Sequence, residues 1–153
     1  MDFLFTAEAG LTGLFLASFL AATLLPGGSE VVLVAVVVAH PEQTTLAWAL
    51  ATAGNTLGGM STYIMGRCLP DTAAAKVDAR VGVGKTAAGS QKAVAALQQH
   101  GAPLLVLAWV PVVGDVLCLA AGWLRLPWLP VSIWMLLGKG ARYGALVAGI
   151  SAL

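Results

Sequence analysis

Charged residues are scarce in this chain, and their scarcity excludes an ordinary water-soluble fold. Asp, Glu, Lys and Arg make up 10% of the 153 residues, whereas a soluble domain has about 25%. Hydrophobic residues reach 59%, above the usual range of about 45–50%. Eight basic and seven acidic side chains cannot cover the surface of a globule of this size. Lipid is therefore expected to cover much of the molecule, which predicts an integral membrane protein.

Several functional classes lack the residues that they would need. The formal net charge is only +1, so no broad positive field points to nucleic acid. The two cysteines, Cys68 and Cys118, have neither the number nor the spacing of a zinc site or a disulfide framework. His40 and His100 have no partner at ligand spacing, so no metal is expected. The sequence has no nucleophile elbow, phosphate loop or metalloprotease motif, so neither an enzyme nor a cofactor is predicted.

The first hydrophobic region is broken in its middle. Residues 11–25 would give about 22 Å of helix and residues 31–39 about 13 Å, whereas the hydrocarbon core is about 30 Å thick. Pro26, Gly27 and Gly28 lie between them and would stop a helix. The region is therefore predicted to form a re-entrant hairpin, which enters and leaves the membrane on one side.

Two other hydrophobic segments, residues 44–66 and 131–153, are long enough to cross the membrane at about 34 Å each. Between them, residues 68–100 are rich in Ala and Gly and hold four of the eight basic residues. They are expected to form a water-exposed linker with a helix around residues 90–100 on the membrane surface.

Small residues recur at every fourth position of the segment 44–66. In a membrane, such a stripe lets helix backbones approach closely. A neighbouring stripe becomes more polar toward its end and includes Asn55, Gly59, Tyr63 and Arg67. The first stripe consists of Gly54, Gly58, Thr62 and Gly66.

The second half of the sequence repeats the broken pattern of the first. Residues 25–35 align without gaps on residues 110–120, and each stretch has a proline, three small or aliphatic residues, a carboxylate and an apolar run. The alignment pairs Pro26 with Pro111 and Glu30 with Asp115. Gly114 lies within the second break. Chance similarity between two kinked hydrophobic segments is the alternative explanation.

Counting the membrane crossings predicts that the two repeats are inverted relative to each other. The first hairpin returns to its own side, the next helix crosses once, and the second hairpin therefore enters from the far side. The predicted fold is an all-α membrane domain with a first hairpin and helix in residues 1–67, a polar amphipathic linker in 68–100, and a second hairpin and helix in 101–153. Paired broken helices of this kind indicate a transporter's binding site near the bilayer middle.

Charges inside the hydrophobic segments mark the candidate site. A charge at the bilayer centre costs about 2.5–3.5 kcal/mol on insertion scales. Two acids at facing tips, with two cations three residues apart on the last helix, could bind an anionic headgroup and relay a proton. The candidate binding residues are Glu30, Asp115, Lys139, Arg142, Asn55 and Tyr63.

A purely structural role is the alternative for the two acids. Each begins a half-helix, with Ser29 or Gly114 as the candidate N-cap, where a carboxylate gains from the helix dipole. Paired with Lys139 or Arg142, the acids would then hold the bundle together without binding a ligand.

Two further arginines, Arg67 and Arg125, are expected at the membrane interface, in contact with lipid phosphates. Both fall on the linker side, together with the basic residues of the linker itself. By the positive-inside tendency the linker is predicted to be cytoplasmic and both termini to face outward.

Five stretches of sequence together resemble one family. They are residues 22–33, residues 54–67 with Gly54, Asn55, Tyr63 and Arg67, and residues 109–115, 120–125 and 138–143. This combination resembles the DedA superfamily, also called VTT or SNARE-associated Golgi protein domains, and in particular its short YqaA-like branch. The resemblance implies opposed re-entrant hairpins, a bacterial inner-membrane location, and movement of lipids across the bilayer in membrane homeostasis, in some members with proton coupling.

Departures from the family pattern lie around Pro111. Longer members carry arginines there, whereas this chain has Trp109, Val112, Val113 and Asp115, so a shared phosphate-lipid substrate does not follow. The chain also lacks the extra terminal helices of longer relatives, and a homodimer is one way to close the cavity. A transporter of a lipid or small anion is thus the first hypothesis. A non-transporting membrane scaffold is the second, and an intramembrane hydrolase, for which no nucleophile is evident, is the third.

Overall fold

The structure, a computed structural model, describes residues 7–23, 28–69, 94–110 and 113–151. Every regular element in these ranges is helical and none is a strand, which confirms the predicted all-α class. Residues 94–100 are also helical. The other elements are α1 (Ala7–Ala21), α2 (Ser29–Ala39), the 3-10 helix η2 (Pro41–Gln43), α3 (Thr44–Cys68), the 3-10 helix η3 (Ala102–Trp109), α6 (Val113–Trp123) and α7 (Trp128–Ser151).

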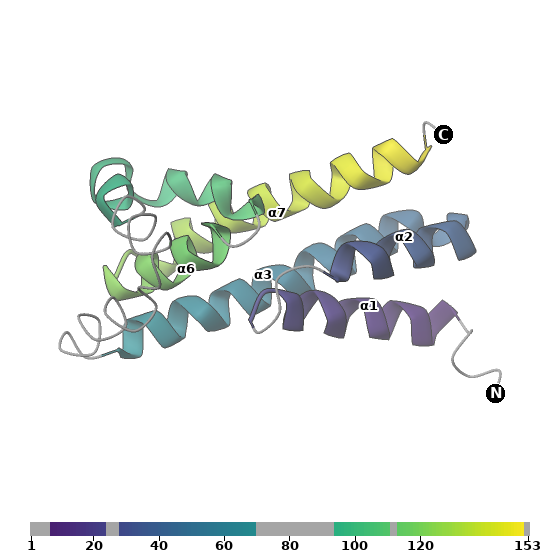
Figure 1. Ribbon diagram of the computed structural model, residues 1–153, viewed down its shortest axis with the longest axis horizontal. Coiled ribbons are helices and arrows are strands. Elements are labelled where there is room, and N and C mark those ends of the chain that lie inside the picture. The colour runs from purple at the N-terminus through teal and green to yellow at the C-terminus, as the bar shows by residue number, and fades with distance from the viewer. Residues whose placement is uncertain (1–6, 24–27, 70–93, 111–112, 152–153) are drawn as a thin grey trace, which may run out of the picture.

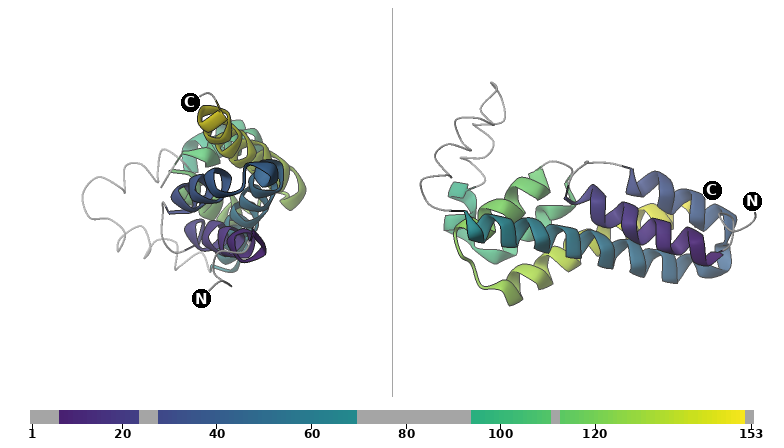
Figure 2. Two further views of the ribbon diagram at one scale, coloured as in Figure 1. Left: turned by 90° about the vertical axis from the view of Figure 1, so that its right-hand side faces the viewer. Right: turned by 90° about the horizontal axis from the view of Figure 1, so that it is seen from below.

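Two long helices, α3 and α7, run in opposite directions along the long axis of the molecule (Figure 1). The pair α1 and α2 lies at the end that holds both termini. The pair η3 and α6 lies at the other end, next to residues 94–100 (Figure 2). The inner ends of both pairs fall near the middle of the long axis (Figure 1).

Glycines on α3 bring the backbone of α1 into contact. A Cβ at Gly54 would lie 2.5 Å from the carbonyl oxygen of Phe15, and one at Gly58 would clash with that of Phe19. One turn further on, Thr62 Oγ1 donates a hydrogen bond of 3.2 Å to the carbonyl of Ala22. The small-residue stripe therefore does pack a helix closely, as its spacing predicts.

Close packing through glycine also joins α3 to α6, and here both helices supply a glycine. A Cβ at Gly66 would clash with the carbonyl oxygen of Leu119, and one at Gly122 would clash with that of Tyr63. On α7, Gly138 likewise receives the backbone of η3 at Val106. Each long helix thus has glycine positions at which the backbone of a neighbouring helix packs directly against it.

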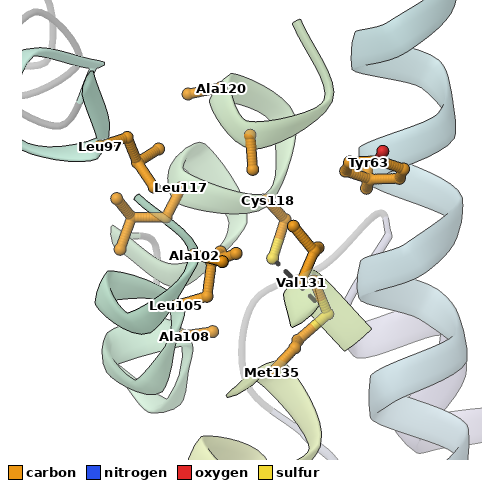
Figure 3. Packing of buried hydrophobic residues seen from close by; sticks show 11 residues of the cluster. Tyr63, Leu97, Ala102, Leu105, Ala108, Leu117, Cys118, Ala120, Val131 and Met135 are labelled. Carbon is orange, nitrogen blue, oxygen red and sulfur yellow. Dashed lines mark hydrogen bonds between the residues drawn. The ribbon is translucent and has the colours of Figure 1, made fainter. Parts of the chain in front are cut away.

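Two clusters of buried hydrophobic residues lie at opposite ends of this frame. The cluster at the linker end joins α3, η3, α6 and α7 (Figure 3), and within it the Cys118 thiol lies 3.9 Å from the Met135 sulfur. Leu97 belongs to the same cluster and is 1% exposed. The predicted surface helix of the linker therefore buries one side chain in the core. The other cluster gathers residues of α1, α2, α3 and α7, among them Leu14, Leu33 and Tyr143.

Some expected boundaries and caps are wrong. Helix α7 begins at Trp128, so Pro130 lies in its first turn rather than in a preceding loop, a position where proline is tolerated. The N-cap of α2 is Gly28 at φ 139°, not Ser29, because Ser29 already adopts helical geometry. Similarly, α6 begins at Val113, which puts Gly114 inside the helix. There it packs against the backbone of η3.

Among the described residues, length and mean hydropathy identify one candidate membrane span, and it is a bent pair of helices. Among the described residues, no single helix is both long and apolar enough to qualify, whereas α2 and residues 41–68 qualify together, with a bend of 120°. Helices α3 and α7 have 25 and 24 residues, which is close to the predicted lengths of the segments 44–66 and 131–153.

Candidate functional site

Lys139 is a buried charge at the crossing of α3 and α7. Its side chain is 3% exposed. The ammonium Nζ donates to the backbone oxygen of Asn55 at 2.8 Å and to its side-chain Oδ1 at 2.5 Å. Both acceptors are neutral, and the ion pairs that the structure describes do not include Lys139. The middle of the bundle thus holds an ammonium whose direct partners are amide oxygens.

The side-chain amide of Asn55 is fully bonded, which fixes its orientation. Nδ2 donates to the carbonyl of Ser18 on α1 at 3.1 Å and to the hydroxyl of Tyr143 on α7 at 3.0 Å. With both N–H groups in use, Oδ1 is left to accept from Lys139. One residue of α3 therefore connects α1 and α7 and holds the ammonium in place.

Two adjacent polar pairs attach the first turn of α2 to α7. The hydroxyls of Ser29 and Tyr143 lie 2.8 Å apart, and both residues are buried. Next to them, Glu30 forms an ion pair with Arg142. This pair is partly open to its surroundings, with side-chain exposures of 34% for Glu30 and 21% for Arg142. The structure thus brings together Glu30, Arg142, Asn55 and Lys139 from the predicted set.

Asp115 approaches the same cluster from the other half of the molecule. It lies in the first turn of α6 and is close enough to Lys139 for an electrostatic interaction. Glu30 and Asp115 therefore have different cationic neighbours, Arg142 for the first and Lys139 for the second.

Tyr63 lies in a different place, about 12 Å further along α3 than Asn55. Its hydroxyl donates to the carbonyl of Leu126 at 2.6 Å and accepts from Nη1 of Arg67 at 2.8 Å. Neighbouring Arg125 has the left-handed backbone angle φ 53°. The structure does not bring Tyr63 to Lys139, but joins it to Arg67 at the turn between α6 and α7.

Five residues were predicted to break the two hydrophobic regions, and the structure describes two of them. Gly28 precedes α2 with φ 139°, where a residue with a side chain would be strained. Gly114 makes the contact with η3 described above. Pro26, Gly27 and Pro111 lie outside the described residues.

Sequence reasoning missed two members of the cluster, Ser18 and Tyr143. Ser18 is 0% exposed, and its hydroxyl has no hydrogen-bond partner among the described residues. Nothing in its local sequence distinguishes it from other small residues of α1. Tyr143 could have been predicted from its spacing, because it lies one helical turn after Lys139 and therefore on the same face of α7.

The family model described as the VTT domain matches residues 25–151. The chain belongs to the VTT-domain family. This result confirms the resemblance to the DedA superfamily that the sequence motifs indicate.

Two relatives of this VTT-domain protein cover most of its length. "Inner membrane protein YqaA" of Escherichia coli (strain K12) is 46% identical over 141 residues, which are 90% of this chain and 89% of the relative. An "Uncharacterized protein" of Haemophilus influenzae is 40% identical over 141 residues, or 88% of this chain and 83% of the relative. No solved structure matches the chain.

Proposed function

We propose that this VTT-domain protein moves a lipid or a small anion across the bacterial inner (plasma) membrane. The observation that carries the proposal is the buried ammonium of Lys139 where the two long helices cross. An ionisable residue inside a membrane protein is costly and usually marks a pathway for an ion or substrate. The name of the Escherichia coli relative supports the location.

The arrangement of the helices supports an inverted repeat of two re-entrant hairpins. The pairs α1/α2 and η3/α6 lie at opposite ends, and their inner ends come near the middle of the molecule (Figure 1). Broken helices at membrane depth are tolerated where they are buried in protein or line a cavity. Paired broken helices are also the typical setting of a transporter's binding site. In this proposal α3 and α7 cross the bilayer, and Glu30, Asp115, Lys139 and Arg142 surround the path of the cargo.

Lipid contact and orientation are parts of the same proposal. Arg67 and Arg125 are both exposed and would meet lipid phosphates on the linker side. By the positive-inside tendency this side is cytoplasmic. A C-terminal reporter that is active only in the cytoplasm should therefore stay inactive, and activity would reverse the orientation. A homodimer that closes the cavity is checked by the mass of the purified protein in detergent.

A scaffold that binds partner proteins without transport is the second candidate. The backbone contacts at Gly54, Gly58, Gly66 and Gly122 favour it, because tightly packed helices make a rigid membrane body. The two candidates differ in what they require of the acids. A scaffold needs only their shape and hydrogen bonding, whereas a transporter of charged cargo also needs their charge.

The experiment uses the purified protein in liposomes, with labelled lipids whose headgroup accessibility is followed over time. Glu30→Gln and Asp115→Asn keep shape and hydrogen bonding but remove the titratable charge. We expect both variants to insert and fold, and to lose lipid movement or its pH dependence. The paired acids are compatible with proton coupling, so the rates are measured at several pH values.

Circular dichroism and gel filtration in detergent provide the control for folding. They separate a lost charge from a lost fold, since Glu30→Gln also removes the ion-pair partner of Arg142. Two folded variants that move lipid like the parent would leave the acids without a transport role and favour the scaffold.

A further inference from the structure

Two adjacent glycines of α3 make room for different neighbours. A Cβ at Gly58 would meet the backbone of Phe19, which cannot move without shifting α1. A Cβ at Gly59 would instead meet the Met135 sulfur at 2.6 Å and Nζ of Lys139 at 3.0 Å. Both of these atoms are at the ends of flexible side chains. Gly58 therefore accommodates a helix, whereas Gly59 accommodates the side chains of Met135 and Lys139.

The space at Gly59 exposes one particular acceptor. In an α-helix, Cβ points toward the N-terminus, so the side chain at one position covers the turn before it. Gly59 is one turn after Asn55, and its missing side chain leaves the Asn55 carbonyl accessible to a second donor. Lys139 reaches that carbonyl at 2.8 Å. Gly59 and Asn55 thus form a notch in α3 that receives the ammonium.

The notch holds Lys139 without cancelling its charge. An ammonium has three donors, and the described bonds use two of them, both to neutral oxygens of Asn55. Arg142 differs, because Glu30 is in direct contact with it. Asp115 acts on Lys139 at longer range. A desolvated cation whose direct partners are neutral attracts an anion, because a nearby opposite charge stabilises the charged form.

We propose that the Gly59–Asn55 notch holds the Lys139 ammonium as the charge that selects an anionic cargo. Gly59 is a positioning residue that acts through Lys139. The cargo is an anion that accepts hydrogen bonds, and phosphate serves as the probe, carried on a lipid headgroup or free in solution. This inference rests on the proposed transport function and adds the identity of the selecting group.

The test compares wild type, Gly59→Ala and the matched control Gly140→Ala in phosphatidylcholine liposomes. A Cβ at Gly140 would meet side-chain atoms of Thr52 and Trp48 at 3.4 and 3.7 Å, which are ordinary contacts. One arm follows fluorescent phosphatidylglycerol and fluorescent phosphatidylcholine by their accessibility to an added quencher. The other arm measures efflux from liposomes loaded with inorganic phosphate. The two arms distinguish a headgroup from a free anion.

We expect wild type and Gly140→Ala to prefer the anionic probe in at least one arm. Gly59→Ala should reduce that preference, expressed as the ratio of anionic lipid or phosphate transport to phosphatidylcholine transport, about tenfold, as the loss of a hydrogen bond to a charged group implies. A merely structural role of Gly59 would lower all rates together and leave the ratio unchanged, which overturns the inference. So does a wild-type protein without preference for the anion.

A second variant keeps the test decisive if Gly59→Ala does not fold. Asn55→Asp has nearly the same shape and puts a carboxylate against Lys139, so it should also remove the preference. Retention of the wild-type ratio in folded Asn55→Asp contradicts the inference. If wild type moves neither lipid nor phosphate, the proposed function itself fails. The two failures are therefore distinguishable.

Discussion

Helices α2 and α6 hold corresponding places in the two halves, yet they meet the opposite long helix in different ways. Helix α6 lies backbone to backbone with α3, because Gly66 and Gly122 each admit a carbonyl of the other helix. Helix α2 meets α7 through polar side chains, in the pairs of Ser29 with Tyr143 and of Glu30 with Arg142. Backbone contacts through glycine leave little freedom, whereas side-chain pairs can exchange partners. The α3–α6 contact is therefore the fixed part of the molecule, and the α2–α7 contact is the part suited to change.

The two long helices, α3 and α7, pack closely at matching positions but carry different polar side chains there. Asn55 and Lys139 are each the twelfth residue of their helix. Each follows a glycine, Gly54 or Gly138, that receives the backbone of α1 or η3 respectively. One position carries an amide and the other an ammonium, and the two are bonded to each other. Close packing is thus common to both halves, while the cation belongs to one half only.

The largest expected effect comes from breaking the fixed contact. Gly122→Ala puts a methyl group against the carbonyl of Tyr63, where neither backbone can yield without separating α3 from α6. We expect a loss of about 3 kcal/mol or more in the free energy of unfolding, at the upper end for overpacking. Thermal unfolding in detergent measures it, with Gly140→Ala as the control. An unchanged midpoint for Gly122→Ala would show that the contact is not rigid.

A smaller effect is expected from the polar contact. Tyr143→Phe removes hydrogen bonds to Ser29 and to Nδ2 of Asn55. With two buried partners left unpaired, the free energy of unfolding should fall by about 1–3 kcal/mol. The same unfolding assay reports this value. The rate of lipid movement should also fall, because α2 loses a link to α7.

Ser29→Ala provides the partner for a double-mutant cycle with Tyr143→Phe. It removes only one of the two bonds of Tyr143, so its effect alone should be the smallest of the series. The effects of the two substitutions should not add, since they remove the same bond. Additive effects would mean that Ser29 and Tyr143 are not coupled.

The helices and their breaks could be predicted because they depend on local sequence. Hydrophobic runs, prolines and glycine spacing indicated the order of the elements and the close contacts of α3. The arrangement of side chains at the site depends instead on how α7 is rotated against α3, which no single segment encodes. Periodicity placed Asn55 and Tyr63 on one face of α3 but could not show that only Asn55 meets Lys139. It could not identify Ser18 either, since its role depends on the packing of α1.

The 3-10 form of η3 determines how far this segment reaches along the molecule. At about 2.0 Å per residue its eight residues extend about 16 Å, whereas an α-helix of the same residues would extend about 12 Å. Runs of 3-10 helix longer than about four residues are uncommon, so this arm is stretched relative to the form that most helices adopt. Rewinding it would draw Trp109 back by about 4 Å toward Ala102 and thus away from α1 and α2. The reach of η3 is therefore set by helix type as well as chain length, and the distance between spin labels at its two ends measures it directly.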